Sequence, residues 1–180
     1  MDRLRLATVW LGGCSGCHMS FLDLDEYLIT LAEVADIVYC PIIDAKEYPR
    51  DVDVALVEGA VANEENREML LRVRERTKFL IAFGDCAGAG NVTAMRNPLG
   101  DPESVLARSY VDTAEPPSSP PVAAGIVPIL LPRVLPIHRV VNVDLFLQGC
   151  PPSAPRIRNV LEQIVAGRRP PFDDMVVRFG

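Results

Sequence analysis

The sequence predicts an α/β fold, in which a mostly parallel, five-stranded sheet is wound on both faces by helices in the flavodoxin-like, doubly wound order. Short apolar and β-branched runs alternate along the chain with segments of helical periodicity. This alternation is typical of a parallel sheet covered by helices. The chain has 180 residues, which suits one such domain with a full hydrophobic core.

Four strands are predicted in the first half of the chain, at residues 4–10, 36–40, 53–57 and 78–83. Each run is short, rich in apolar residues and followed by glycine, proline or a polar turn. Residues 41–51 form a polar connection between the second and third strands.

Two helices are predicted between these strands. The first begins near Met19 and extends to about Ala35, because apolar residues recur on one helical face; they are Phe21, Leu24, Leu28, Leu31 and Ala35. The second follows Asn63, a typical N-cap residue, and places Glu64 and Glu65 in its first turn.

Residues 91–139 carry no long periodic segment. The chain has sixteen prolines, many of them in this region, and the run Glu115–Pro121 cannot continue a helix or a central strand. We expect a long, irregular, Pro-rich loop that is ordered by packing on a partner, because its apolar residues between 126 and 135 need burial. The fifth strand is expected at 140–147.

The last helix is expected over 153–166. The domain should therefore span residues 1–166, and the tail at 167–180 is a second candidate for partner contact.

Composition narrows the class of protein. The net charge is −6, and no lysine/arginine run stands out, which disfavours nucleic acid and anionic membranes as partners. No apolar run is long enough to span a bilayer. The chain enters its first strand without a charged leader or an apolar signal core, so we expect a cytoplasmic protein with no membrane span.

Five cysteines provide the clearest chemical signal. An odd number in a chain of cytoplasmic character argues against a disulfide framework. Cys14 and Cys17 follow the first predicted strand, Cys86 the fourth and Cys150 the fifth. Because the carboxyl ends of parallel strands meet at one edge of the sheet, these four thiols should converge. Cys40 follows the second strand, which the flavodoxin-like order places at the sheet edge, and we interpret it as a small buried hydrophobe.

Small residues accompany the four thiols. They are Gly12, Gly13 and Gly16 after the first strand, Gly84, Gly88 and Gly90 after the fourth, and Gly149 after the fifth. Glycine permits close backbone approach, so that amide N–H groups can point at the sulfurs of a cluster. Pro151 and Pro152 fix the chain after the last thiol. We therefore expect Gly13, Gly16, Gly84, Gly149 and Pro151 to surround the site.

Four cysteines suit either zinc or an iron–sulfur cluster. A thioredoxin-like dithiol would use Cys14 and Cys17 but would leave Cys86 and Cys150 unexplained. Structural zinc sites usually take their ligands as two close pairs, whereas this chain offers one pair and two distant single cysteines. The spacing favours a four-iron cluster, with zinc and an absence of metal as open alternatives.

The motifs resemble those of a known family. Cys14-Ser15-Gly16-Cys17, Val57-Glu58-Gly59, Gly84-Asp85-Cys86-Ala87 and Gly149-Cys150-Pro151-Pro152, in this order, are similar to the small subunit of nickel–iron hydrogenases. A related cluster-bearing 20 kDa-type subunit occurs in NADH:quinone oxidoreductase, but with adjacent cysteines in place of Cys14-x-x-Cys17. The resemblance implies a proximal 4Fe–4S cluster held by the four cysteines, which exchanges electrons with the nickel–iron centre of a separate large subunit.

The short chain resembles the small subunit of cytoplasmic, NAD-reducing bidirectional hydrogenases. That resemblance implies iron–sulfur and flavin diaphorase subunits as further partners, which carry other clusters and FMN. Subunits of F420-reducing hydrogenases and sulfhydrogenases are also similar, so the electron acceptor stays open. The fold class often binds FMN itself, but the turn after the first strand lacks the Ser/Thr-rich sequence that would hold its phosphate.

Three polar residues lie within these motifs or directly beside them. We expect His18 either to face the cluster or a partner, or to serve as a polar residue at the helix start. Glu58 follows a central strand at the switch point, where it could tune the cluster or relay protons, or simply bind backbone amides. Asp85, beside Cys86, is interpreted as a turn-former.

Overall fold

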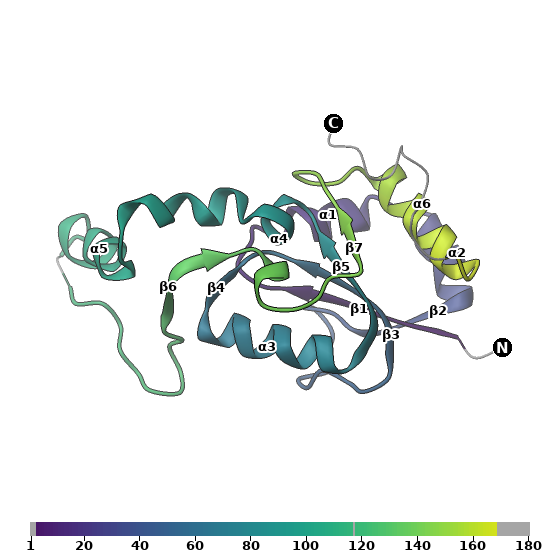
Figure 1. Cartoon of the computed structure of the whole chain (residues 1–180), viewed down its shortest axis with the longest axis horizontal. Helices are drawn as coiled ribbons and strands as arrows, with labels where there is room; N and C mark the ends of the chain where they lie inside the picture. The colour runs from purple at the N-terminus through teal and green to yellow at the C-terminus, as the bar shows by residue number, and fades with distance from the viewer. Residues whose placement is uncertain (1–2, 117, 169–180) are drawn as a thin grey trace.

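The computed structural model describes residues 3–116 and 118–168, and a parallel sheet forms its centre (Figure 1). Its strands are β1 (Leu4–Trp10), β2 (Ala35–Tyr39), β3 (Val52–Glu58), β5 (Thr77–Phe83) and β7 (Leu145–Leu147). They lie in the order β2-β1-β3-β5-β7, and every neighbouring pair is parallel. This is the flavodoxin-like order, so the predicted fold class is confirmed and β2 is an edge strand.

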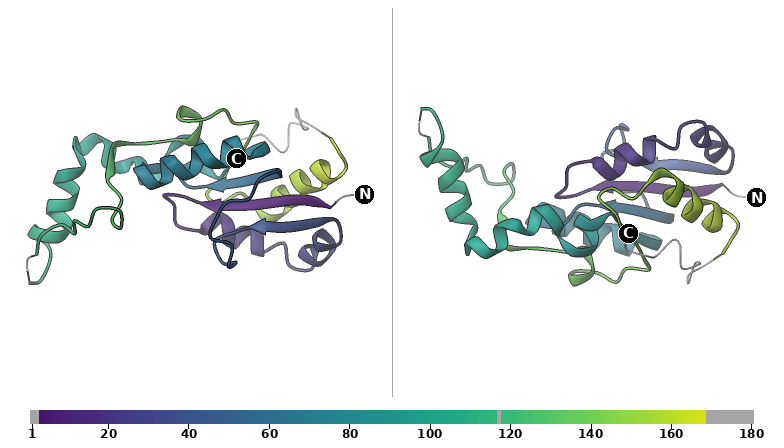
Figure 2. Two further views of the ribbon diagram at one scale, coloured as in Figure 1. Left: turned by 90° about the horizontal axis from the view of Figure 1, so that it is seen from below. Right: turned by 90° about the horizontal axis from the view of Figure 1, so that it is seen from above.

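Helices cover both faces of this sheet (Figure 2). One face packs on α1 (Gly16–Leu22), α2 (Tyr27–Val34) and α6 (Ala154–Val165). The other packs on α3 (Glu64–Glu75) and α4 (Asp85–Ala89). β3 and β5 are apolar over nearly their whole length because both of their faces are buried.

The single helix predicted from Met19 to Ala35 is wrong. The structure divides it into α1 and α2, with a turn between them in which Asp25 has a φ of 48°. Leu24, within that turn, is still 6% exposed and packs in the core. The apolar spacing thus continues through the turn, and for that reason periodicity alone suggested one helix.

The start of α3 agrees with the prediction. The side-chain oxygen of Asn63 accepts a hydrogen bond from the backbone N–H of Asn66 at 2.7 Å. This is N-capping, in which a side chain satisfies an N–H group that the helix leaves unpaired.

Residues 91–139 contain more regular structure than we predicted. They form the 3₁₀ helix η1 (Asn91–Leu99), α5 (Pro102–Ala107), the π-helical turn η2 (Arg108–Asp112), β6 (Leu130–Leu135) and the 3₁₀ turn η3 (Ile137–Arg139). Pro102 is compatible with a helix because it occupies the first turn, where its missing N–H costs nothing. Residues 91–112 extend away from the sheet in both figures, and we call them the arm.

The chain returns from the arm through β6, which pairs antiparallel with the short strand β4 (Val61–Asn63). Leu131 and Val134 of β6 are buried, whereas Ile126 and Ile129 before it are 82% and 76% exposed. Burial of this apolar stretch is therefore only partly achieved within the chain, and its packing on a partner stays a prediction.

The fifth strand is shorter than predicted, since only Leu145–Leu147 pair with β5. Residues 140–144 approach it as irregular chain that follows η3. The last helix agrees with the prediction to within a residue at each end. Of the tail predicted at 167–180, residues 169–180 lie outside the described residues. Within the described part of the chain, no helix combines the length and apolar character needed to cross a membrane.

Candidate iron–sulfur site

The turn after β1 carries Cys14 and Cys17. It is bound to the turn after β3, because Leu11 N–H donates to the Glu58 carbonyl at 2.8 Å, and Gly12 and Ala60 exchange backbone hydrogen bonds at 2.9 and 2.8 Å. α1 then begins with Cys17 buried, while Cys14 stays exposed. The first thiol pair therefore lies on a turn that the neighbouring strand holds in place.

The turns after β5 and β7 carry the other two thiols and are also bound together. Gly84 N–H donates to the Leu147 carbonyl at 2.8 Å, and Asp85 N–H donates to the Gly149 carbonyl at 2.9 Å. The Asp85 carboxylate accepts the Gly149 N–H at 2.8 Å. Asp85 thus links the turn of Cys86 to that of Cys150, which confirms its predicted structural role.

The four thiols also influence one another electrostatically. Burial raises the pKa of Cys17, and Coulombic repulsion from Glu58 and from the other three thiols raises it further. Burial also raises the pKa of Cys86, and a hydrogen bond with Thr93 lowers it. Coulombic repulsion from Cys150, Cys14 and Glu58 raises the pKa of Cys86 further. The turns that follow three strands therefore carry Cys14, Cys17, Cys86 and Cys150 at the same edge of the sheet, and their joint binding of a cluster stays a prediction.

Cys40 does not belong to this group. It follows β2 and is half-buried, so the prediction of a buried side chain is wrong. It lines a mostly apolar cavity of about 280 Å³ together with Trp10, Phe21, Leu22, Ile37 and Ile42. Its exposure follows from the edge position of β2, which has a neighbouring strand on one side only.

Glycine is required where the turns approach the thiols. Gly84 has a φ of +86°, and a Cβ atom there would lie 2.2 Å from the sulfur of Cys17. A Cβ atom on Gly16 would lie 3.2 Å from the sulfur of Cys14. The backbone thus leaves space for sulfur at these points, because no side chain occupies it.

Two other predicted residues serve the turns themselves. A Cβ atom on Gly13 would lie 3.1 Å from the Gly59 Cα atom and 3.5 Å from a carboxylate oxygen of Glu58. Gly149 makes the hydrogen bonds with Asp85 and precedes Pro151. A direct role of Gly13, Gly149 or Pro151 toward a cluster stays a prediction.

Glu58 and His18 form a pair that the sequence did not reveal. Glu58 is the last residue of β3 and is 1% exposed. Its carboxylate accepts the backbone N–H of His18 at 2.9 Å and also contacts Nδ1 of the same histidine. The Nε2 atom of His18 is buried and has no hydrogen-bond partner within the described structure. A signal was available in Gly12-Gly13 and Gly59, since small residues in both turns allow this close approach.

The residues present fit an iron–sulfur cluster. The donor set consists of four sulfurs, which is the usual ligand set of such clusters. The glycine turns leave room beside two of these sulfurs. Among the described residues, no group of three or more His, Cys, Asp or Glu side chains is arranged to hold a metal ion, so the fit rests on the donor set and the glycine turns.

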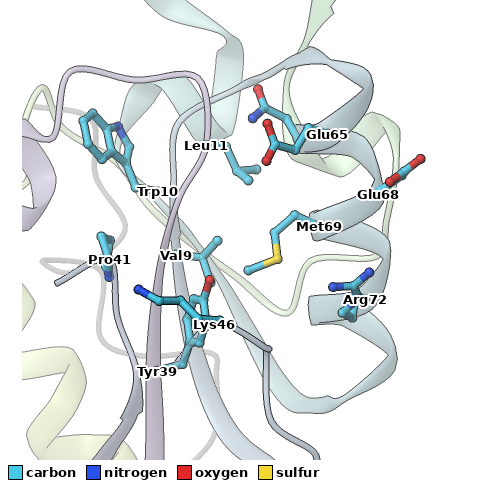
Figure 3. A pocket seen from close by; sticks show the side chains of 11 residues that line it. Val9, Trp10, Leu11, Tyr39, Pro41, Lys46, Glu65, Glu68, Met69 and Arg72 are labelled. Atoms are coloured by element: carbon cyan, nitrogen blue, oxygen red, sulfur yellow. The ribbon is translucent and has the colours of Figure 1, made fainter. Parts of the chain in front are cut away.

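A charged cavity lies apart from the thiols (Figure 3). It has a volume of about 450 Å³ and lies between β1 and α3, with Met69 reaching from α3 toward the strand. Lys46, Glu65, Glu68 and Arg72 supply its charges, and no cysteine of the described chain lines it. This cavity is therefore not part of the candidate iron–sulfur site.

Comparison with known proteins identifies the family. Residues 14–164 match the model of the NADH ubiquinone oxidoreductase 20 Kd subunit family. The chain is 40% identical over 177 residues to the delta subunit of the NAD-reducing hydrogenase HoxS of Cupriavidus necator, covering 95% of this chain and 82% of that protein. It is 36% identical to a subunit of the F420-non-reducing hydrogenase of Methanothermobacter marburgensis, covering 92% of this chain and 54% of that protein.

The chain therefore spans about half the length of the archaeal subunit, but most of the bacterial one. Among solved structures, a chain from the crystal structure of an NAD⁺-reducing [NiFe]-hydrogenase in the H₂-reduced state superposes with a TM-score of 0.92. The two are 39% identical, and the match covers 99% of this chain and 100% of that chain. Together with the four thiols at one sheet edge, these matches show that the chain belongs to the 20 kDa subunit family of NADH:ubiquinone oxidoreductase, among the small subunits of nickel–iron hydrogenases.

Proposed function

We propose that this chain holds one 4Fe–4S cluster through Cys14, Cys17, Cys86 and Cys150. The observation that carries the proposal is the convergence of these four thiols, from three strand ends, at one edge of the sheet. When bound, the cluster supplies one-electron transfer between the nickel–iron centre of a large subunit and an NAD-reducing module with further clusters and FMN.

The chain itself breaks and forms no bond of the substrate. Its residues position the sulfurs: Cys17 is buried in α1, and the Asp85–Gly149 hydrogen bonds fix the turns of Cys86 and Cys150. Glu58 holds the start of α1 through the His18 N–H. Rigid turns of this kind keep ligand geometry constant between oxidation states, which favours rapid electron transfer.

NAD is the acceptor that the relatives support best, because a bacterial relative and the superposing crystal structure both bear the description NAD-reducing. The overall reaction would be H₂ + NAD⁺ = H⁺ + NADH, in a complex that we expect in the cytoplasm. The alternatives are the small subunit of an F420-linked hydrogenase or a sulfhydrogenase, since relatives of those names also match.

Metal analysis of the ligand variants tests the cluster. Cys86→Ala and Cys150→Ala should each lose iron and acid-labile sulfide after anaerobic purification, because each removes one of four ligands. Cys40→Ala is the matched control and should keep both, since Cys40 is not among the groups that shift the pKa of Cys17 or Cys86. Zinc without iron or sulfide would exclude the electron-transfer role, and iron loss in the Cys40 variant with retention in the Cys150 variant would refute the ligand set.

Co-purification tests the complex and its acceptor. We expect a tagged chain to bring down a nickel-containing large subunit together with flavin-containing subunits. The purified complex should reduce NAD⁺ with hydrogen. Reduction of a deazaflavin such as F420 in place of NAD⁺ would move the protein to the other hydrogenase class without affecting the cluster assignment.

A further inference from the structure

One side chain approaches a proposed ligand sulfur from outside the four cysteine turns. Asn91 begins the arm, directly after α4, and its side-chain Nδ2 atom lies 3.4 Å from Sγ of Cys150. Sulfur is larger than oxygen, so this separation is that of an N–H···S hydrogen bond. Asn91 is not a cysteine, a glycine or a member of any motif that predicted the site, and sequence reasoning gave it no role.

The backbone around Asn91 is specialised for this approach. Its φ is 39°, in the left-handed region that few residues other than glycine and asparagine adopt readily. Gly90, just before it, has a φ of +86°, and its N–H donates to the Cys86 carbonyl at 2.9 Å. Two successive left-handed residues therefore turn the chain out of α4 and direct the amide back toward the thiols.

The turn is also held from its other side. Ala94 N–H donates to the Gly90 carbonyl at 3.1 Å, and the Thr93 hydroxyl donates to the same carbonyl at 2.7 Å. Because Gly90 is in turn bound to Cys86, the position of the Asn91 amide is fixed relative to two of the four thiols. Cys150, its acceptor, is otherwise an exposed side chain.

The chemistry determines which end of the amide faces the sulfur. A cysteine that ligates iron is a thiolate, which has no proton and can only accept hydrogen bonds. The Nδ2–H group of Asn91 is attracted to such a sulfur, whereas its carbonyl oxygen would be repelled. The orientation in the structure is thus the one that a loaded site requires.

We infer that Asn91 is a positioning residue that donates an N–H hydrogen bond to the Cys150 thiolate and thereby raises the reduction potential of the cluster. This inference rests on the proposed function and deepens it. Reduction adds negative charge to the cluster and its sulfurs, and a donor stabilises the more negative state. Hydrogen bonds to sulfur are among the factors that set the potential of an iron–sulfur cluster.

The test is a redox titration of the anaerobically purified complex, followed by electron paramagnetic resonance. Asn91→Gly tolerates the left-handed backbone and removes the donor, so its cluster should keep full iron and titrate at a more negative potential than wild type. Asn91→Asp keeps the size and backbone preference but presents a carboxylate to the sulfur. Its potential should shift further in the same direction.

Asn97 provides a matched control at the other end of η1. Its amide donates to the Val134 carbonyl at 2.9 Å and accepts the Val134 N–H at 2.7 Å, so it binds β6 and no thiol. Asn97→Gly should lower the thermal stability of the complex and leave the cluster potential at the wild-type value. If the role of Asn91 were purely structural, its variants would likewise lower the thermal stability and leave the cluster potential unchanged.

The outcomes separate this inference from the function on which it rests. A wild-type complex without iron and sulfide would remove the proposed function, and the inference with it. A loaded wild type and a loaded Asn91→Gly variant with equal potentials would overturn the inference alone. If Asn91→Gly loses its iron, the cluster potential of the Asn91→Asp variant is the deciding measurement. A wild-type potential in Asn91→Asp would also overturn the inference.

Discussion

The two edges of the central sheet have opposite chemistry. At the amino ends of the strands, charges are paired within the chain: Asp53 accepts the Arg5 N–H at 2.8 Å and the Lys78 ammonium at 2.7 Å, and Asp144 binds Arg74 at 2.7 Å. At the carboxyl ends lie four free thiols and the buried Glu58. One edge completes its interactions internally, whereas the other presents groups suited to a ligand from outside. Ion pairs within the chain and groups suited to a ligand thus lie at opposite ends of the strands.

The largest effect should come from filling the space beside a thiol. Gly84→Ala would place a Cβ atom 2.2 Å from the sulfur of Cys17 at a φ of +86°. We expect a loss of about 3 kcal/mol in the free energy of unfolding, from backbone strain and overpacking, together with loss of iron. Chemical denaturation and iron analysis measure both.

Gly125→Ala is the control for that variant. Gly125 also has a positive φ, of +76°, but a Cβ atom there would meet nothing within 4 Å. The Gly125→Ala variant should lose only about 1 kcal/mol in the free energy of unfolding, from backbone strain, and should retain iron. If Gly84→Ala and Gly125→Ala lost the same free energy of unfolding, the need for glycine at position 84 would not come from the space beside the Cys17 sulfur.

A smaller loss should follow from removing the buried carboxylate of the same edge. Glu58→Ala leaves the part-buried His18 N–H without its acceptor, which we expect to cost about 2 kcal/mol. Glu58→Gln keeps an acceptor oxygen and should cost less. Chemical denaturation of the two variants checks this order, and a more stable Glu58→Ala protein would contradict the role given to the carboxylate.

Thiol titration gives the carboxyl edge its own pH dependence. The unfolded thiol ionises near pH 9, whereas burial, followed by repulsion from Glu58 and the other thiols, raises the pKa of Cys17 in the folded, cluster-free chain. The folded state then binds more protons above pH 9, so the free energy of unfolding should fall as the pH rises. The slope should reach about 1.4 kcal/mol per pH unit for each such thiol.

This slope is best measured between about pH 8.5 and 9.5, because Tyr48, whose pKa burial raises from its usual value of 10.0 to about 12, adds a slope of the same sign once the pH approaches 10. Cys17→Ala should make the slope shallower, and Cys86, whose pKa is also raised, should account for part of what is left. Denaturation curves of the cluster-free protein at several pH values supply the data. A stability that is constant over this interval would be inconsistent with buried protonated thiols.

The amino edge should show the opposite pH dependence and the smallest effect. Burial opposes ionisation of Asp53, but hydrogen bonds from Lys78 and the Arg5 N–H outweigh it and hold the pKa of this carboxyl below its usual value of 3.8. Its stabilisation is therefore present above about pH 4 and lost as the pH falls through the folded-state pKa. At pH 7, Asp53→Asn should lose at most about 1 kcal/mol.

In acid, wild type and Asp53→Asn should have the same free energy of unfolding, because the wild-type carboxyl is then protonated. Thermal unfolding at pH 7 and at acidic pH measures this, and iron content should be unaffected at neutral pH. Iron loss in Asp53→Asn would show that the two edges are not independent.

Strand positions and the convergence of the thiols followed from local patterns. β1 was predicted at its observed bounds, and the order of the sheet placed Cys14, Cys17, Cys86 and Cys150 at one edge. These features are predictable because they depend on short apolar runs and on the general handedness of parallel sheets.

What escaped prediction depends on contacts between distant segments. β6 is stabilised by pairing with β4, which lies almost seventy positions earlier in the chain, so its own sequence of proline and apolar residues reads as a loop. The Glu58–His18 pair and the Asn91–Cys150 contact likewise join residues from separate turns. Local periodicity contains no information on such pairs.

The distribution of the thiols along the chain has a consequence for biosynthesis. Cys14 and Cys17 leave the ribosome early, but the turn that carries Cys150 can bind to the turn of Cys86 only after β7 has been made and has joined the sheet. A nascent chain that has not reached this point offers at most three of the four sulfurs. The proposed cluster site can therefore be complete only after β7 and the turn that carries Cys150 have been synthesised.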